Sequence, residues 1–505
     1  METSSNGSTP EPPDTSNPRP IVVKTKQKYV HFDLKGMPLK ADAYGTIFSY
    51  LKGLGVNGVL LEYEDMFPFH GRLSVIANKE AYSEANIKTI LKAAQDYELK
   101  VIPLVQTFGH MEYVLKLKEF TDLKEHDNFL QCICPSNRNS IELVQDMINQ
   151  VMKLHPGIEH FHIGSDEVYY LGFCRHCRER MQRFKLKREE LFLSHVTQVA
   201  GFVKNRHKVQ PLMWDDEFRK MDEKVIMKYE IGTLVEIVVW NYTPNIIEQI
   251  PRKIWEKYGK VFKAVWIGSA FKGADKPNSI MANEMHYLSN HISWMDAISE
   301  FRYDVKCKGI FLTGWQRYDH FSVLCEIFPV AMPSLVTCML YLNSVGQQPL
   351  PEKILGRAHD SIKLYQNSET FTFPGSEIYD SVLALSKLQK SMIEFKETPI
   401  YQGWMHDINL QNQFCSPSHV EQILAHVMKF KGELDTLKPK LLLALRSMFP
   451  EWSVQEFMRT NLLPIATQIS SLEISLNQIK KKRTFPVRPI TFSDEAGQNT
   501  DPLLH

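Results

Sequence analysis

The sequence predicts an α/β fold, a (β/α)₈ TIM barrel followed by an α-helical C-terminal extension. Short apolar runs alternate with helical patterns from Tyr29 to about Leu342, and beyond Pro351 the pattern is helical alone. Eight strand–helix repeats in about 300 residues match the number and size of such a barrel. The alternative, an open doubly wound sheet, would need a Gly-rich phosphate loop after its first strand. No such loop follows that strand here, so the barrel is favoured.

The predicted strands are β-rich apolar runs of four to six residues. Most lack the alternation of a half-exposed sheet, as expected of parallel strands that are buried on both faces. In chain order they are Tyr29–Asp33, Gly58–Glu62, Lys100–Val105, Phe161–Gly164, Pro211–Trp214, Val235–Trp240, Lys263–Ile267 and Gly309–Thr313.

Helical patterns separate these runs. Ser83 can cap a helix whose apolar stripe contains Ile87 and Ile90, and Asn139 opens another whose stripe contains Val144. In the C-terminal extension we expect helices at about 352–367, 376–396, 418–436 and 452–482.

The last of these helices carries a heptad-like apolar stripe, and Pro464 should break or kink it. We interpret the stripe as packing against the barrel, and a homodimer through the helical C-terminal region is the alternative. Its residues are Phe457, Leu462, Ile465, Ile469, Leu472 and Leu476.

The charge and apolar content exclude several partners. The chain has 505 residues, of which 43% are hydrophobic, enough for a full core. A formal net charge of +1 gives no global attraction to nucleic acid or to an anionic membrane. The longest apolar candidate, Ile327–Leu342, contains two prolines and is shorter than the roughly 20 residues that span a bilayer. We therefore expect no nucleic-acid and no membrane partner.

We divide the chain into a disordered N-terminal tail (1–22), the barrel (23–346), the α-helical C-terminal region (347–485) and a flexible tail (486–505). The first tail is rich in Ser, Pro, Asn and Thr and has no apolar stretch, so we expect no signal peptide. Eight cysteines are too few for a disulfide scaffold, so we expect thiols and a cytoplasmic protein. Lys480–Arg483 is a candidate nuclear localisation patch, with a basic helix end as the alternative.

Polar side chains, often beside aromatic ones, stand where every predicted strand ends. Such ends converge on the carboxyl-terminal mouth of a barrel, where TIM-barrel active sites lie. A single polar end would carry no weight, because βα loops are commonly polar, but here all the strands have one. The group comprises Asp33, Lys35, Glu62–Asp65, His110, Glu112, Asp166, Glu167, Asp215, Asp216, Asn241, Tyr242, Ser269 and Trp315–His320.

The most specific local feature is the segment His162–Glu167, a strand end followed by two adjacent carboxylates. Neighbouring residues of an extended segment point in different directions, so Asp166 and Glu167 should do different work. One can protonate a leaving-group oxygen as a general acid with a raised pKa, and the other can hold another part of the substrate. Such a pair suits substrate-assisted glycoside hydrolysis, in which a 2-acetamido oxygen of the sugar attacks the anomeric carbon.

These features resemble the β-N-acetylhexosaminidases of glycoside hydrolase family 20, and most closely the branch without a secretory signal. The resemblance covers nearly the whole barrel and extends to the helical C-terminal part. The Asp-Glu pair alone is a weak signal, but the combination of segments is specific. The segments are Val30–Gly36, Leu61–Pro68, Ile102–Glu112, His162–Gly172, Trp214–Asp216, Ser269–Ala274 and Leu312–His320.

The resemblance implies a retaining exo-enzyme that removes terminal β-linked GalNAc or GlcNAc, with a preference for galactosaminides. Asp166 would orient the acetamido group, Glu167 would act as general acid and then as general base, and His110 would support Glu167. Aromatic rings suit the apolar C–H faces of a pyranose, although packing in the core is the alternative for each. The candidate walls are Trp214, Trp240 and Trp315.

Departures from the family pattern concern recognition of the sugar. Lys35 stands near the position where the family often has an Arg. The segment that ends in Gly109-His110 begins with Gln106, where the family usually has an acidic residue. After Trp315 the family has a Glu, whereas this chain has Gln316. Tyr242 is the candidate for the tyrosine that contacts the acetamido oxygen. The other candidates for substrate binding are Asp33, Glu64, Asp65, Asp216, Arg317 and Asp319.

Two cysteine pairs fall on neighbouring predicted loops. Cys132-Ile-Cys134 and Cys174-Arg-His-Cys177 can place four thiolates around a structural zinc, although Cys-x-Cys is not the usual spacing. We favour the alternative, free structural thiols. The implied mechanism needs no cofactor and no metal.

Two other functions compete with hydrolysis of a carbohydrate that ends in an N-acetylhexosamine. A catalytically silent barrel would bind glycans or another protein, but it would have no use for a protonated acid. An O-GlcNAc hydrolase would act on glycopeptides, which a tight exo pocket disfavours.

Overall fold

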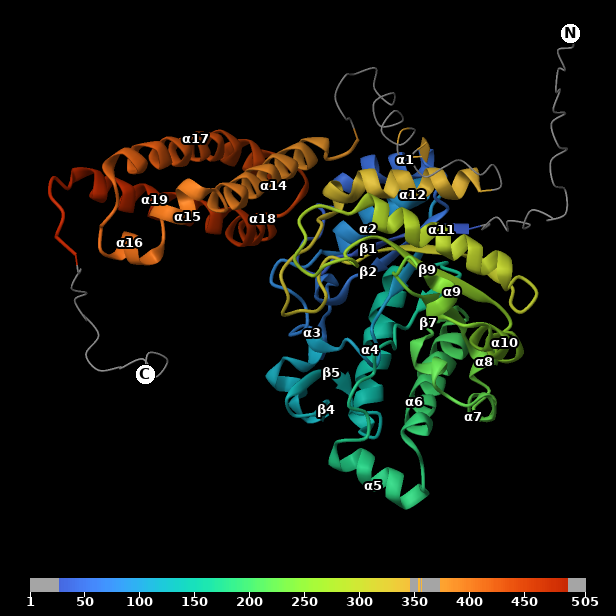
Figure 1. Cartoon of the computed structure of the whole chain (residues 1–505). Coiled ribbons are helices and arrows are strands. Elements are labelled where there is room, and N and C mark those ends of the chain that lie inside the picture. The colour runs from blue at the N-terminus through green and yellow to red at the C-terminus, as the bar shows by residue number, and fades with distance from the viewer. Residues whose placement is uncertain (1–26, 346–352, 355, 357–372, 489–505) are drawn as a thin grey trace, which may run out of the picture.

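A closed barrel of eight parallel strands forms the N-terminal part of the chain, as the sequence predicts (Figure 1). The computed structural model describes residues 27–345, 353–354, 356 and 373–488. Around the barrel the strand order is β1-β10-β9-β8-β7-β6-β3-β2, and each predicted run overlaps one strand. The strands are β1 (Gln27–Asp33), β2 (Gly58–Glu62), β3 (Lys100–Leu104), β6 (His160–His162), β7 (Gln210–Trp214), β8 (Glu236–Trp240), β9 (Val265–Lys272) and β10 (Cys307–Gly314).

Helices connect these strands, and a small hairpin of β4 (Lys124–His126) and β5 (Phe129–Ile133) is inserted after β3. Ser83 caps α2 as predicted, whereas α4 is capped by Asn137 and not by Asn139. The Asn137 side chain accepts the backbone N–H of Asn139, so Asn139 lies in the first turn. The helices are α1 (Ala43–Gly53), α2 (Glu84–Asp96), α3 (Glu112–Leu115), α4 (Arg138–Leu154), α5 (Arg175–Phe184), α6 (Arg188–Phe202), α7 (Glu223–Lys228), α8 (Ile231–Leu234), α9 (Ile246–Gln249), α10 (Arg252–Val261), α11 (Glu284–Glu300) and α12 (Met332–Ser344).

Large apolar side chains fill the interior of the barrel, so the barrel is a packed core and not a pore. Trp240 and Trp315 are partly buried and pack on this interior cluster. They extend the core toward the carboxyl ends of the strands, where the loops begin. The cluster consists of Tyr29, Leu60, Ile102, Leu104, Leu212, Trp214, Val238, Trp266 and Phe311.

The C-terminal region is a helical bundle. The predicted helix 376–396 is confirmed as α14, and the one predicted at 418–436 continues to Met448 because Pro439 does not end it. The helix predicted at 352–367 lies almost wholly outside the described residues, as do the N-terminal tail and residues 489–505. The helices are α14 (Ser376–Lys396), α15 (Pro399–Trp404), α16 (Asp407–Gln411), α17 (Pro417–Met448), α18 (Glu451–Phe457) and α19 (Leu463–Lys481).

The part of the predicted apolar stripe that lies on α19 packs mainly against α17 rather than against the barrel. Ile465, Ile469 and Leu476 of α19 are 5%, 2% and 0% exposed. The helix is interrupted at the π-helical turn Met458–Leu462, and Pro464 lies in the first turn of α19, where it removes no helical hydrogen bond. Because α17 covers Ile465, Ile469 and Leu476, these side chains are not available to a second chain, and a homodimer through another face of the C-terminal region stays a prediction.

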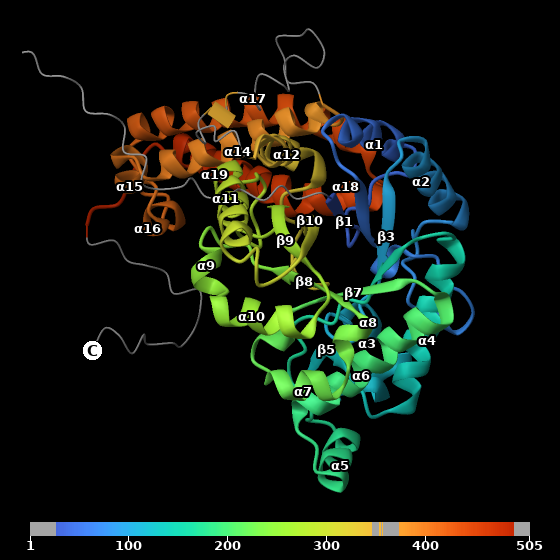
Figure 2. The ribbon, with the colours of Figure 1, turned by 90° about the vertical axis from the view of Figure 1, so that its right-hand side faces the viewer.

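The bundle joins the barrel beside β1 and β10. The backbone N–H of Lys40 donates to the carbonyl of Met448 at 2.8 Å, and Arg317 donates to Glu456 at 2.7 Å. Figures 1 and 2 show α14, α17 and α19 at one end of the molecule and α5 at the opposite end. Within the described ranges, no helix is long and apolar enough to cross a bilayer.

Candidate active site

A cavity of about 210 Å³ opens at the carboxyl ends of the barrel strands. It is smaller than the roughly 300–1,000 Å³ pockets that hold drug-sized ligands, so it suits a single small ring. Residues at or beyond the ends of all eight strands line it. They are Lys35, Glu62, Glu64, Gln106, His110, Asp166, Glu167, Trp214, Trp240, Tyr242, Gly273, Ala274, Trp315, Arg317 and Tyr318.

Most of the site residues predicted from the sequence are among these lining residues, but Asp33, Asp65, Asp216 and Asp319 are not. The carboxylate of Asp33 accepts the ammonium of Lys35 at 3.0 Å and the backbone N–H of Gln316 at 2.7 Å, so it joins the ends of β1 and β10.

Asp216 holds two other parts of the site in place. Its carboxylate accepts the backbone N–H of Glu167 at 2.9 Å and the indole N–H of Trp240 at 3.2 Å. Asp319 accepts backbone N–H groups of its own turn, and Asp65 accepts the side-chain amide of Asn78 at 3.5 Å. Among the described residues, Asp216 is the one of these three whose side chain hydrogen-bonds to residues that line the cavity.

One imidazole nitrogen lies between the two adjacent carboxylates. His110 Nε2 is 3.1 Å from Glu167 Oε2 and 3.4 Å from Asp166 Oδ2. The hydroxyl of Tyr169, which the sequence analysis did not single out, donates to Glu167 Oε1 at 2.9 Å. Asp166 Oδ1 is buried and has no hydrogen-bond partner among the described residues. Asp166, which lines the cavity, therefore has one acceptor oxygen without a donor among the described residues.

The backbone around this group adopts uncommon conformations. His110, Ser165 and Glu167 have φ values of 51°, 69° and 47°, in the left-handed region that non-glycine residues rarely occupy. Each costs on the order of 1–3 kcal/mol, and such residues cluster at functional sites. A Cβ on Gly109 would collide with the backbone carbonyl of Asp166, so the glycine lets the His110 loop approach the carboxylate pair.

The electrostatics of the His110–Glu167 pair favour a proton on the imidazole. Burial alone would lower the pKa of His110, but the charge of Asp166 and the hydrogen bonds to both carboxylates raise it well above its ordinary value. The hydrogen bond from His110 lowers the pKa of Glu167 and outweighs burial. The sequence-based expectation that the acid has a raised pKa is thus not met in this geometry, because the imidazole is close enough to hold the proton.

Four aromatic side chains form the walls of the cavity. The ring centroids of Trp214 and Trp315 are 6.1 Å apart, and the rings of Trp240 and Tyr242 stack at 5.2 Å. The indole N–H of Trp315 donates to the hydroxyl of Tyr242 at 3.0 Å, which fixes one wall against the other. Such walls suit the apolar faces of a sugar ring.

Charged side chains also line the cavity, and the ammonium of Lys35 lies over the Trp315 ring, 5.4 Å from its centroid. Lys35 pairs with Glu64 at 3.4 Å, and His320 also pairs with Glu64. Burial raises the pKa of Glu64 well above its ordinary value. Burial would also raise the pKa of Glu62, but Lys35 and His31 lower it. Lys35 was predicted to lie at the mouth with the other polar residues at strand ends, but it was not among the candidates for substrate binding.

The C-terminal region fixes the position of one residue that lines the cavity. Arg317 is 10% exposed in its side chain, and its Nη2 lies 2.6 and 2.7 Å from the two carboxylate oxygens of Glu456 in α18. Its guanidinium also donates to the carbonyl of Ser322 at 2.7 Å. The helical bundle therefore positions a cationic group of the cavity.

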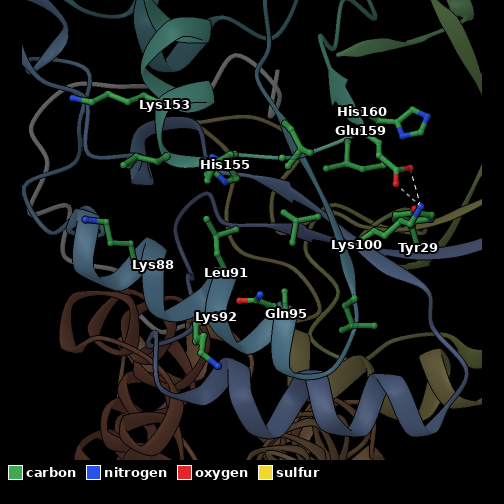
Figure 3. Close-up of a pocket in the computed structure, with 18 residues that line it drawn as sticks. Tyr29, Lys88, Leu91, Lys92, Gln95, Lys100, Lys153, His155, Glu159 and His160 are labelled. Atoms are coloured by element: carbon green, nitrogen blue, oxygen red, sulfur yellow. Dashed lines mark hydrogen bonds and ion pairs between the residues drawn. The ribbon is translucent and has the colours of Figure 1, made fainter. Parts of the chain in front are cut away.

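A larger cavity of about 790 Å³ lies at the other end of the strands, between α2, α4 and the starts of β3 and β6 (Figure 3). Its single acidic lining residue among those described, Glu159, pairs with Lys100 at 2.8 Å. Glycoside hydrolysis needs a pair of acids, and the amino-terminal face of a TIM barrel usually serves stability. The cavity with Asp166 and Glu167 is therefore the candidate active site.

Comparisons with known proteins agree with this fold. The family described as glycosyl hydrolase family 20, catalytic domain, matches residues 65–256. Hexosaminidase D of Homo sapiens is 36% identical over 475 residues, which cover 92% of this chain and 97% of the human protein. Hexosaminidase D of Bos taurus is 45% identical over 314 residues, which cover 62% of this chain and 90% of the bovine protein.

The fold has a counterpart among solved structures. A β-N-acetylhexosaminidase from Bacteroides fragilis superimposes with a TM-score of 0.50 and 16% identity, over 69% of this chain and 72% of that chain. At this identity the likeness shows the fold alone. The identity and coverage of the human relative show more: the chain belongs to glycoside hydrolase family 20 and is a β-N-acetylhexosaminidase.

Proposed function

We propose that this enzyme is a retaining exo-β-N-acetylhexosaminidase that uses the acetamido group of its substrate as the nucleophile. The observation that carries the proposal is the contact of Asp166 and Glu167 with one nitrogen of His110 at the cavity where the strands end. The two carboxylates lie on the same side of the cavity, where one can address the acetamido group and the other the leaving group.

The first step breaks the glycosidic bond. Asp166 Oδ1, buried and unpartnered among the described residues, accepts the acetamido N–H and polarises the group. The acetamido carbonyl oxygen then attacks the anomeric carbon, while the proton shared by His110 and Glu167 passes to the departing oxygen. The carboxylate of Asp166 stabilises the cationic, oxazoline-like ring that forms.

The second step restores the sugar. Glu167, now ionised, removes a proton from water, and the water oxygen attacks the anomeric carbon from the face that the leaving group vacated. The acetamido group re-forms, and the product keeps the β configuration. The same residue acts as acid and then as base, as microscopic reversibility requires.

The other acids of the cavity are poorly placed to act as a protein nucleophile. Glu62 bonds to His31 at 2.9 Å, and Glu64 pairs with Lys35 and His320. A retaining enzyme with its own nucleophile needs a free carboxylate about 5 Å from the acid, across the bond that breaks. The polar group formed by Lys35, Glu64 and Arg317 is better suited to bind sugar hydroxyls, and so to discriminate GalNAc from GlcNAc.

The test is hydrolysis of nitrophenyl β-GalNAc and β-GlcNAc beside nitrophenyl β-galactoside and β-glucoside. We expect activity on the N-acetylated pair alone, because the other two sugars lack the nucleophile. The ratio within the active pair gives the sugar preference. Equal activity on the galactoside would contradict substrate assistance, and folded protein without activity on any of the four would support a silent binding barrel.

The pH profile tests the role of His110. The singly protonated His110–Glu167 pair keeps its proton up to the raised pKa of His110. Activity should fall only as the pH rises through that value. In His110→Asn, Glu167 alone holds the proton, so the alkaline limb of kcat/KM should move to lower pH. The measurement uses a substrate with a poor leaving group, and an unchanged limb would show that His110 does not share the catalytic proton.

A further inference from the structure

Three cysteines and one glutamate meet outside the active-site cavity. Glu125 lies in β4, Cys134 follows β5, and Cys174 and Cys177 lie at the start of α5. One potential ligand atom from each lies within 4.8 Å of all the others. We propose that Glu125, Cys134, Cys174 and Cys177 bind one zinc ion and form a structural site.

The distances suit tetrahedral coordination. Cys134 Sγ is 3.2 Å from Cys174 Sγ and 3.7 Å from Cys177 Sγ, and Cys177 Sγ is 3.1 Å from Glu125 Oε2. Two sulfurs that each lie about 2.3 Å from zinc at the tetrahedral angle are about 3.8 Å apart. The four side chains therefore need to open only slightly to surround an ion. As the sulfurs bind, the three thiols release their protons to solvent.

The start of α5 is suited to thiolate ligands. Cys174 is the N-cap of α5, and its sulfur accepts the backbone N–H of Cys177 at 3.2 Å. The partial positive charge of a helix N-terminus stabilises an anion there. α5 also carries four arginines against one glutamate, which offsets the negative charge of three thiolates and a carboxylate around one Zn²⁺.

The burial of Glu125 is the second argument for a cation. This carboxylate is 1% exposed. Its described hydrogen-bond partners are the backbone N–H of Cys174 and the thiol of Cys177, and neither is cationic. A buried carboxylate is costly unless it is paired or bound to a metal. A divalent ion at the centre of the cluster would supply the missing charge.

Cys132 does not belong to the cluster, although the sequence pattern pairs it with Cys134. Its thiol faces the carbonyl oxygen of Ile133 at 3.6 Å, and Glu125 provides the fourth ligand position instead. The set of ligands is thus Cys₃Glu and not the Cys₄ set considered from the sequence. Cys132 is the natural control, since it is a buried cysteine of the same hairpin.

The ion would tie two segments that carry active-site residues. Cys174 ends the loop that begins with Glu167, and Cys134 closes the β4–β5 hairpin. That hairpin is bonded to the His110 loop, since the backbone N–H of Met111 donates to the carbonyl of Gln131 at 2.9 Å. A bound ion would hold the far ends of both loops together on the α5 side of the barrel.

The test measures metal in the full-length protein, purified without chelator, by inductively coupled plasma mass spectrometry. We expect one zinc per chain in the wild type and in Cys132→Ser, and loss of the ion in Cys174→Ser and Cys177→Ser. If a variant does not fold, wild-type protein stripped by a chelator is titrated with Co²⁺. Thiolate coordination then gives a sulfur-to-cobalt charge-transfer band. Removal of zinc should lower the melting temperature by about 5 °C or more.

Three outcomes would overturn the zinc site. They are wild-type protein that holds no zinc as purified and takes up none on titration, Cys177→Ser that retains a full equivalent, and intact-mass evidence for a disulfide within the cluster. None of these readouts depends on hydrolysis. Failure of the zinc site is therefore distinguishable from failure of the proposed glycosidase mechanism.

Discussion

Glu167→Gln should reduce kcat/KM for substrates with poor leaving groups by about 10³-fold, within the roughly 10²–10⁴-fold range of general acid catalysis. The change removes the proton donor but keeps the size of the side chain and its place beside His110. For a dinitrophenyl glycoside, whose leaving group departs without protonation, kcat/KM should fall by about tenfold or less. The measurement is kcat/KM across a series of aryl N-acetylhexosaminides of graded leaving-group pKa.

The dependence of kcat/KM on the pKa of the leaving group distinguishes loss of the general acid from damage to the fold. A misfolded or misaligned variant would lose activity on every substrate to the same extent, whereas loss of protonation steepens the dependence on the leaving group. Glu142→Gln, a surface change in α4 that removes an exposed pair with Arg138, is the matched control and should leave the slope unchanged. A uniform loss in Glu167→Gln would show that Glu167 is not the acid.

The barrel and the catalytic pair could be predicted because they depend on local sequence. Apolar runs that alternate with helical stripes specify buried parallel strands, and in a barrel the residue after each strand must lie at the same mouth. Asp166 and Glu167 follow such a run directly. Their placement beside the cavity needs no knowledge of any distant residue.

The remaining assignments depend on partners that are far away in the chain. Asp33 ends β1 and Asp216 follows β7, but Asp33 contacts Gln316 beyond β10, Asp216 contacts Trp240 of β8, and neither carboxylate lines the cavity. The periodicity of α19 shows which face is buried but not that α17 covers it. Glu125 had no signal at all, because a single acid on a short hairpin has no fixed spacing from the cysteines that it meets.

The proton on His110 illustrates the same limit. From the sequence, an acid catalyst calls for a carboxyl with a raised pKa, which burial alone would provide. The structure places an imidazole 3.1 Å from that carboxyl and a second carboxylate beside it, and together they favour the imidazolium. Whether His110 or Glu167 stores the proton is set by these distances. The identity of the residues does not decide it.

Asp166→Asn should reduce kcat/KM by about 10²–10³-fold for poor and activated leaving groups alike, the magnitude that follows loss of one preorganised electrostatic partner of a transition state. The amide keeps the size of the side chain but removes the negative charge that faces the cationic intermediate. The leaving-group slope should stay that of the wild type, because protonation by Glu167 is untouched. Asp146→Asn, which removes an exposed pair with Arg72, is the matched surface control.

A second series tests the nucleophile that Asp166 is proposed to orient. Fluorine atoms on the acetamido methyl withdraw electrons from the carbonyl oxygen, so the wild-type rate should fall with each fluorine added if that oxygen attacks the anomeric carbon. With a protein nucleophile, the rate would depend little on the fluorination. In Asp166→Asn the acetamido group is less well oriented, so the dependence should persist at a lower overall rate. Acetamido participation would be contradicted if Asp166→Asn had nearly wild-type activity and the wild-type rate did not change with fluorination. A wild-type rate that falls steeply with each fluorine would support it.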